Sequence, residues 1–306
     1  MSNQKATLVV ILIGLFYGST LVASRFGLRQ FNPVPYTALR LLLASSAYLV
    51  ILTLTRRRLP RVPAFWLWSI LVGLTTVVLP MLCNTTSLLY QSSGVTGLLL
   101  TLTPVITVCM AQIFLPGEPF TLQKISGALV AFTGAALLLA SGETGIAELA
   151  RASWQGYILV FIALLANSSG FVIVRKRMSQ ADPITYTAIS TFFATLVMVA
   201  LAFLTTGFDF SRARTSGYAV VIYTSLIGTF SAQLLRNWLN SRTSAALASA
   251  TELVVPVASV SLGALLLGEQ VTWIMLIGMG LIMSGVLLLN QGAAVKSAAA
   301  KTSASS

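Results

Sequence analysis

The sequence predicts an all-α membrane protein in which ten transmembrane helices form two five-helix repeats of inverted topology. Three observations predict this fold class. Of the 306 residues, 56% are hydrophobic and only 8% are charged, whereas roughly a quarter of the residues in a soluble domain are charged. Ten apolar segments, each close to the 20 or so residues that cross a bilayer, follow one another with short connections. The two halves of the chain also resemble each other.

The first five segments run between turn or charge signals. The first follows Lys5 and is interpreted as an uncleaved helix, because nine further segments follow and no small-residue cleavage site closes it. The second contains Arg40 about one turn inside the outer surface, the third contains Pro80, and the fourth contains Pro104. We expect these helices at residues 6–23, 36–55, 64–90, 94–115 and 121–141.

The second half offers five more segments of the same kind. The sixth contains Asn167, the eighth contains several amides, and the ninth contains both Glu252 and Pro256. The tail at 293–306 has only Ala, Ser, Lys and Thr after Val295 and is predicted to be disordered. The expected helices are residues 154–174, 184–206, 216–238, 244–267 and 272–291.

Topology follows from the positions of the basic residues. With the N-terminus in the cytoplasm, thirteen Lys and Arg residues, Arg236 and Arg242 among them, fall on the inner side and five on the outer side. This asymmetry obeys the positive-inside rule and predicts a multi-pass protein of the cytoplasmic (inner) membrane with both termini in the cytoplasm. It also explains the net charge of +12 without a nucleic-acid partner. The lipid bilayer is the partner that we expect.

Several chemistries are excluded by composition. The chain has no histidine, so it cannot form a Ser-His-Asp group or a His-ligated metal site. Cys83 and Cys109 lie within apolar segments, where a thiol packs as a small hydrophobic group. Of the seven acids, only Glu252 lies well inside a span, so a two-aspartate intramembrane protease lacks its parts. We therefore expect no enzyme, metal or cofactor.

An internal repeat relates the two halves. At a shift of 150 residues Pro33 and Tyr36 match Pro183 and Tyr186, and at a shift of 151 Gly117-Glu118 matches Gly268-Glu269. Further matches are Gly127 with Gly278, Gly134 with Gly285, and, at a shift of 152, Pro104 with Pro256. The repeats are predicted at residues 1–142 and 154–292. Because each holds five helices, an odd number, the second enters the membrane from the opposite side, as alternating access with a site near the midplane requires.

These residues resemble a known family. Leu15 to Ser19, Asn32 to Arg40, Pro104 with Gly117-Glu118, and Ala245 through Pro256 to Glu269 are similar to the EamA repeat of the drug/metabolite transporter superfamily. The resemblance implies an exporter of amino acids or other small metabolites, monomeric or weakly dimeric, with a cavity lined mainly by the first, third, fourth, sixth, eighth and ninth helices. Tyr17 and Asn167 both stand where the family commonly has Trp.

Glu252 is the sharpest functional signal. An ionisable group at this depth either binds a substrate amine or exchanges a proton, or it makes a structural hydrogen bond to a neighbouring helix. Apolar surroundings would favour its neutral form. Leu100 occupies the equivalent position in the first half, which makes the two halves chemically unequal.

Prolines and small residues mark a second candidate feature. Pro80, Pro104 and Pro256 each free a backbone carbonyl, and such carbonyls are costly in lipid unless they face a cavity or a neighbouring helix. On the ninth helix Glu252, Pro256 and Ser259 share one polar face, which the repeat maps onto Leu100, Pro104 and Thr107. The face is either part of the pathway or a close helix contact, whereas Gly14 and Gly18 favour packing.

Neutral polar and aromatic residues complete the candidates. Amides can hydrogen-bond a zwitterion or join helices, and aromatic rings can hold an ammonium or anchor at the interface. Arg40 can pair with a substrate carboxylate, but snorkelling or bracing a loop is favoured. The predicted substrate-binding residues are Glu252, Asn84, Tyr17, Asn167, Gln233, Asn237, Trp238, Tyr90, Thr107 and Ser259.

The leading functional hypothesis is a broad amino-acid exporter that accepts aromatic and other apolar amino acids and works by alternating access. Efflux of lipophilic cations or other small metabolites is the alternative, for which Glu252 and aromatic rings would suffice. A phosphorylated substrate is disfavoured because the spans lack clustered Lys and Arg. A scaffold or sensor would have little reason to carry an inverted repeat. Uniport and proton antiport both stay open.

Overall fold

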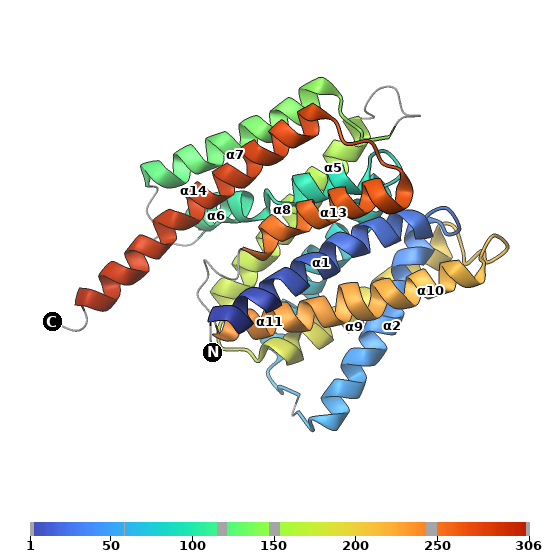
Figure 1. Ribbon diagram of the computed structural model, residues 1–306. Helices are drawn as coiled ribbons and strands as arrows, with labels where there is room; N and C mark the ends of the chain where they lie inside the picture. Colours follow the sequence, from blue (N-terminus) through green and yellow to red (C-terminus); the bar gives the residue numbers. More distant parts are fainter. Residues whose placement is uncertain (1–2, 58, 115–120, 147–153, 243–249, 304–306) are drawn as a thin grey trace.

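The computed structural model describes residues 3–57, 59–114, 121–146, 154–242 and 250–303, and these residues form an all-helical protein (Figure 1). Eight helices are long and apolar enough to cross a membrane, and two shorter apolar helices at Thr251–Leu267 and Trp273–Leu289 complete the ten. The predicted fold class is therefore confirmed.

The first half contributes five spans, two of which are interrupted. The third is one continuous rod with a π-helical segment at its centre, and the fourth breaks at Thr101 and Leu102. The elements are α1 (Asn3–Gly27), α2 (Pro33–Leu54), α3 (Pro63–Val72), η1 (Gly73–Val78), α4 (Leu79–Ser87), α5 (Ser93–Leu100), α6 (Thr103–Phe114) and α7 (Leu122–Ser141).

The second half repeats this order. Its last helix continues to Ser303. The elements are α8 (Trp154–Arg177), α9 (Pro183–Leu204), α10 (Thr215–Tyr223), η2 (Thr224–Ser231), α11 (Ala232–Arg242), α13 (Thr251–Leu267) and α14 (Trp273–Ser303).

The inverted repeat is visible where α7 and α14, the last helices of the two halves, pack side by side (Figure 1). A Cβ on Gly127 would lie 2.7 Å from the carbonyl oxygen of Gly285, and one on Gly134 would lie 2.9 Å from that of Gly278. Residue numbers thus rise along one helix as they fall along the other, so the equivalent helices run antiparallel. Two repeats in the same orientation would place them parallel.

The π-helical segments occupy matching positions in the two halves and were not predicted. Pro80 follows η1 and cannot donate a hydrogen bond to the preceding turn. Hydroxyl groups supply competing donors: Thr76 Oγ1 lies 2.7 Å from the carbonyl of Val72, and Thr224 Oγ1 lies 2.9 Å from that of Val220. Single π-turns of this kind are common at functional sites. Here η1 packs on α9 and η2 on α2, which places both beside the centre of the molecule.

Pro104 lies just after the break between α5 and α6. Its ring removes the amide donor that the carbonyl of Leu100 would otherwise accept from. Thr103 Oγ1 lies 2.6 Å from this carbonyl and donates in its place. The freed carbonyl of Leu100 is therefore satisfied locally, where the chain turns between the two short helices.

Candidate functional site

A cavity of about 370 Å³ lies between the two halves. All six spans that the family resemblance implies contribute to its wall, and so do α2 through Arg40 and α9 through Tyr186 and Thr187. Helices α7 and α14 contribute no side chain to the part of the wall that the structure describes. The molecule thus divides into eight spans around the cavity and a two-helix pair at its side.

Glu252 and Arg236 form an ion pair on the cavity wall. Glu252 Oε1 lies 2.9 Å from an Arg236 terminal nitrogen, with side chains 14% and 22% exposed. The Arg236 guanidinium also stacks over the Tyr17 ring, 4.6 Å from its centroid. The expectation of wholly apolar surroundings for this carboxyl group is therefore wrong, because a guanidinium lies beside it.

The count of basic residues assigned Arg236 to the inner surface, but its side chain lies on the cavity wall. The sequence predicted the end of this span at residue 238, but α11 continues to Arg242. Arg236 lies before the predicted end of the span as well as before the observed one, and its guanidinium contacts Tyr17 of α1 and Glu252 of α13. It is a cavity residue that sequence reasoning missed. The favourable Tyr17 and Glu252 contacts explain why a cation is tolerated there.

Arg40 is the second cation of the cavity and has only neutral partners. Its Nε donates to Thr229 Oγ1 at 2.7 Å and a terminal nitrogen donates to Ser24 Oγ at 3.3 Å. Its side chain is buried, and none of the carboxylates in the described part of the chain forms an ion pair with it. The favoured roles of snorkelling or loop bracing do not describe this position. A buried cation without a counter-charge is costly, so the site suits an anionic group of a ligand.

Half of the predicted substrate-binding residues line the cavity. Tyr17 and Asn167 occupy equivalent positions of the two halves, and both contribute, as do Asn84, Gln233 and Glu252; Pro80 of the predicted helix breaks lies beside them. The Oδ1 atom of Asn84 is buried and has no hydrogen-bond partner among the described atoms. An unsatisfied buried acceptor on a cavity wall is available to a donor on a ligand.

The other predicted residues lie elsewhere. Thr107 donates to Ser168 Oγ at 2.9 Å and joins α6 to α8. Ser259 packs against α5, because a Cβ built on Gly97 would lie 3.0 Å from the Cβ of Ser259. The predicted polar face of the ninth helix therefore divides, with Glu252 on the cavity and Ser259 in a helix contact. Four further residues are also absent from the wall: Trp238, which packs with Val10 and Leu239; Tyr90, beside Gly156; and Pro104 and Pro256. The side chain of Asn237 lies outside the described residues.

The chain is similar to known membrane transporters over nearly its whole length. The EamA-like transporter family matches residues 4–140 and 154–291. An uncharacterized transporter of Archaeoglobus fulgidus is 25% identical over 94% of this chain and 99% of its own. A probable terminal-alkyne amino-acid exporter of Streptantibioticus cattleyicolor is 25% identical over 95% of both chains. An uncharacterized inner membrane transporter, YedA, of Escherichia coli is 25% identical over 91% of this chain and 88% of its own.

The fold is also found in a solved structure. A crystal structure at 20% sequence identity superposes with a TM-score of 0.67, and the match covers 94% of this chain and 96% of the other. At this identity the likeness concerns the fold alone. It supports the arrangement of helices around the cavity and carries no information about the substrate.

Proposed function

Because the chain belongs to the EamA-like transporter family, we propose that it exports amino acids across the cytoplasmic membrane by alternating access. Substrates are expected to include amino acids with aromatic or other apolar side chains. The inverted repeat supports the mechanism, since exchanging the conformations of two similar halves moves the opening of a central cavity from one side to the other.

One observation carries the substrate class: the cavity presents a guanidinium without a counter-charge together with a carboxylate and a free amide oxygen. Arg40 can receive the substrate carboxylate through charge-assisted hydrogen bonds. Glu252 and Asn84 Oδ1 can receive the ammonium group. The carboxylate of a free amino acid would thereby face a positive group of the wall, and its ammonium group would face a negative one.

The rest of the wall suits an apolar side chain. Leu21, Met81 and Phe171 belong to different helices and face the same cavity. Such a pocket discriminates weakly between side chains that differ by a methylene group, which fits broad specificity. The amino-acid exporter among the relatives supports the same substrate class.

Orientation and assembly belong to the same proposal. The excess of Lys and Arg at one surface supports cytoplasmic N- and C-termini. An even number of spans places both termini on one side. All groups of the cavity come from a single chain, so a monomer or a weak homodimer is sufficient for the function.

Efflux of lipophilic cations is the alternative, and the contact of a cation with the Tyr17 ring favours it, because the same ring and Glu252 could hold an organic cation. Arg40 and Arg236 oppose this alternative, since both place positive charge on the wall. Electrostatic repulsion within a low-dielectric cavity disfavours a second cation.

Proteoliposomes distinguish the two functions. Vesicles with the purified protein are loaded with radiolabelled phenylalanine, leucine or tetraphenylphosphonium, and efflux is compared with protein-free vesicles. We expect protein-dependent efflux of both amino acids and none of the organic cation. Absence of amino-acid flux in vesicles that contain folded protein would refute the proposal, and efflux of tetraphenylphosphonium alone would establish the alternative.

Proton coupling is tested in the same vesicles. If Glu252 exchanges a proton during transport, Glu252→Gln abolishes the dependence of efflux on a pH gradient, whereas uniport shows no such dependence in the parent protein. Unchanged flux and unchanged pH dependence in Glu252→Gln would exclude this residue as the coupling group.

A further inference from the structure

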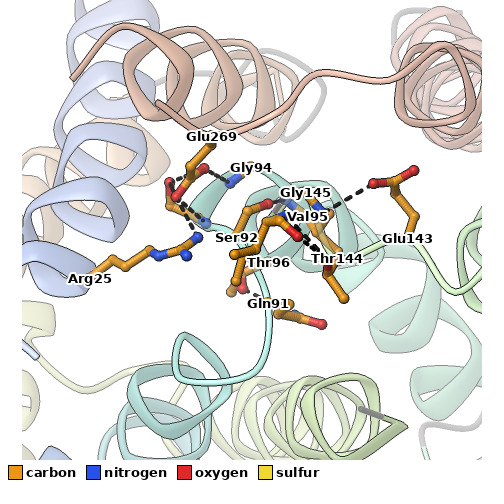
Figure 2. A network of polar contacts seen from close by, with 12 residues as sticks. Arg25, Gln91, Ser92, Gly94, Val95, Thr96, Glu143, Thr144, Gly145 and Glu269 are labelled. Atoms are coloured by element: carbon orange, nitrogen blue, oxygen red, sulfur yellow. Dashed lines mark hydrogen bonds and ion pairs between the residues drawn. The ribbon is translucent and has the colours of Figure 1, made fainter. Parts of the chain in front are cut away.

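A network of polar contacts lies at one end of the molecule, where α1 ends, α5 begins and the loop from α13 to α14 passes both helices (Figure 2). Its centre is Glu269. One carboxylate oxygen accepts from the backbone amide of Ser93 at 2.9 Å and from Arg25 at 2.8 Å, and the other accepts from the amide of Gly94 at 3.1 Å. The Ser93 hydroxyl lies 2.8 Å from both oxygens. We call these four residues the Glu269 cluster.

The local sequence explains how Glu269 reaches α5. Gly268 adopts a left-handed conformation with φ of 67°, which ends α13 and turns the chain back towards the helix. Gly263, one turn earlier, has no side chain, and a Cβ there would lie 2.9 Å from the carboxyl carbon of Glu269. The carboxylate therefore sits against the α13 backbone and faces the first amides of α5.

The hydrogen bonds of Glu269 are charge-assisted and therefore stronger than those between neutral groups. The first amides of a helix have no partner within the helix, and they carry the positive end of its dipole. A carboxylate that accepts from two of them and from a guanidinium forms charge-assisted hydrogen bonds. The Glu269 side chain is only 4% exposed. Moving the carboxylate away from these donors would leave a buried charge and helix amides without an acceptor. The end of α1, the start of α5 and the loop after α13 therefore stay together while the cluster is intact.

The helices joined by this cluster are among those that surround the cavity. Leu21 of α1, Leu100 of α5 and Val255 of α13 all lie on its wall. If the cavity opens along the seam between these helices, α1 and α13 part from α5. A second carboxylate in the same network, Glu143, has other partners. It accepts from the Gly145 amide at 3.0 Å (Figure 2), and it also accepts from Thr272 Oγ1 at 2.7 Å.

Those contacts of Glu143 connect the end of α7 to the start of α14. These two helices pack against each other and take no described part in the cavity wall. Opening the cavity does not require them to separate. The two carboxylates thus lie at the same end of the molecule, but only Glu269 spans a seam between helices of the wall.

We propose that the Glu269 cluster is the gate of this end: the cavity opens here only when Glu269 leaves the amides of α5 and Arg25. By the proposed orientation this end faces the outside of the cell. Glu269 is thus a positioning residue for export that does not touch substrate. The inference rests on alternating access and not on the identity of the substrate.

Cysteine accessibility tests the gate without any substrate. The reporter is Leu21→Cys in a protein with Cys83→Ala and Cys109→Ala, because Leu21 lines the cavity and lies 3.4 Å from where a Gly97 Cβ would be. Intact cells are treated with a membrane-impermeant maleimide. Glu269→Gln should raise the labelling rate by about tenfold, the order expected when hydrogen bonds to a charged group are lost. Arg25→Gln should raise it less, because the cap on α5 persists.

Glu143→Gln is the matched control, since it makes the same change in a hydrogen-bonded carboxylate of the same network. It should leave the labelling rate at the parent value. Equal labelling in Glu269→Gln and the parent, or an equal rise in Glu143→Gln, overturns the assignment. If Glu269→Gln is not recovered as a monodisperse protein, Arg25→Gln decides, and an unchanged rate there also overturns it. Amino-acid efflux by the parent protein is scored separately, so either proposal can fail alone.

Discussion

The two repeats are most alike where they face each other away from the cavity. Gly127 contacts Gly285 and Gly134 contacts Gly278. Because Gly127 is equivalent to Gly278 and Gly134 to Gly285, each contact is the repeat-related copy of the other. A reciprocal contact of this kind is the signature of a two-fold axis, here relating halves of one chain. Four glycines at matching positions allow the backbones of α7 and α14 to approach closely, as small residues do between membrane helices.

The repeats differ most on the cavity wall. Glu252 corresponds to Leu100, and Arg40 corresponds to Ser190, whose hydroxyl donates to the carbonyl of Ser69 at 2.8 Å and joins two helices. The charges of the wall therefore have no counterparts in the opposite repeat. Under the proposed alternating access, the symmetric contacts belong to the framework that would exchange conformations, and the asymmetric charges would orient a substrate with two different ends.

The largest effect is expected from breaking the symmetric contact. A Cβ on Gly285 would lie 2.5 Å from both the amide nitrogen of Ala131 and the carbonyl oxygen of Gly127, so Gly285→Val forces the two backbones apart. Overpacking of this kind costs about 1–3 kcal/mol. We expect a lower midpoint of thermal unfolding in detergent. Gly280→Val is the control, because no atom lies within 4 Å of its would-be Cβ; an equal loss in both variants would contradict the assigned contact.

Removing charge from the wall should affect transport more than stability. Arg40→Gln leaves Thr229 and Ser24 with a neutral partner and takes away the only group proposed to bind the substrate carboxylate. Efflux of phenylalanine should fall by about 10- to 100-fold, the range for loss of a hydrogen bond to a charged group. Arg212→Gln, at an exposed position, is the control; parental phenylalanine efflux in Arg40→Gln would refute this role.

Much of the framework could be predicted because it depends on composition. The length of the apolar segments predicts the membrane spans, and a single shift of 151 residues aligns the glycines of α7 with those of α14. The π-helical segments could not be predicted, since they result from small competing preferences for backbone hydrogen bonds at residues such as Thr76 and Thr224. The break after α5 was visible only as Pro104, which does not reveal where the chain turns.

The site was harder to predict because burial depends on neighbouring helices. Glu252 was recognised from its depth alone, but its partner Arg236 lies one helix away and was counted among surface cations. Arg40 also lies inside an apolar segment, and sequence could not show that its neighbours are Thr229 and Ser24 rather than lipid headgroups. For Thr107, a polar residue in an apolar helix, hydrogen bonding between helices prevailed.

A smaller effect is expected from replacing Tyr17 with asparagine, the residue at the equivalent position 167; both positions line the cavity. Tyr17→Asn removes the ring under the Arg236 guanidinium, 4.6 Å away, and with it a contact typically worth about 0.5–2 kcal/mol. The KM for efflux should rise several-fold while folded yield is maintained. Tyr17→Phe keeps the ring and should behave as the parent. A similar rise in Tyr17→Phe would assign the effect to the hydroxyl instead.

The smallest effect concerns Asp182 and its equivalent Asn32, which precede α9 and α2. Partial burial opposes the charged form of Asp182, but hydrogen bonds from Arg57 and from the Thr185 amide, at 2.9 Å, outweigh it and lower the pKa of the carboxyl. Asp182→Asn keeps an acceptor for the helix cap and removes the ion pair. Since both charged side chains are about a third or more exposed, at 32% and 41%, the loss at neutral pH should be under about 1 kcal/mol.

The sign of the pH dependence follows from the lowered pKa. The contribution of the carboxylate is fully present above the unfolded value of about 3.9 and disappears as the pH falls through the lower value of the folded protein. Thermal midpoints of Asp182→Asn and the parent should therefore differ slightly at pH 7 and converge at an acidic pH at which the carboxyl is protonated in the folded protein as well. A difference of the same size at both pH values would show that the shape of the cap, rather than its charge, stabilises the start of α9.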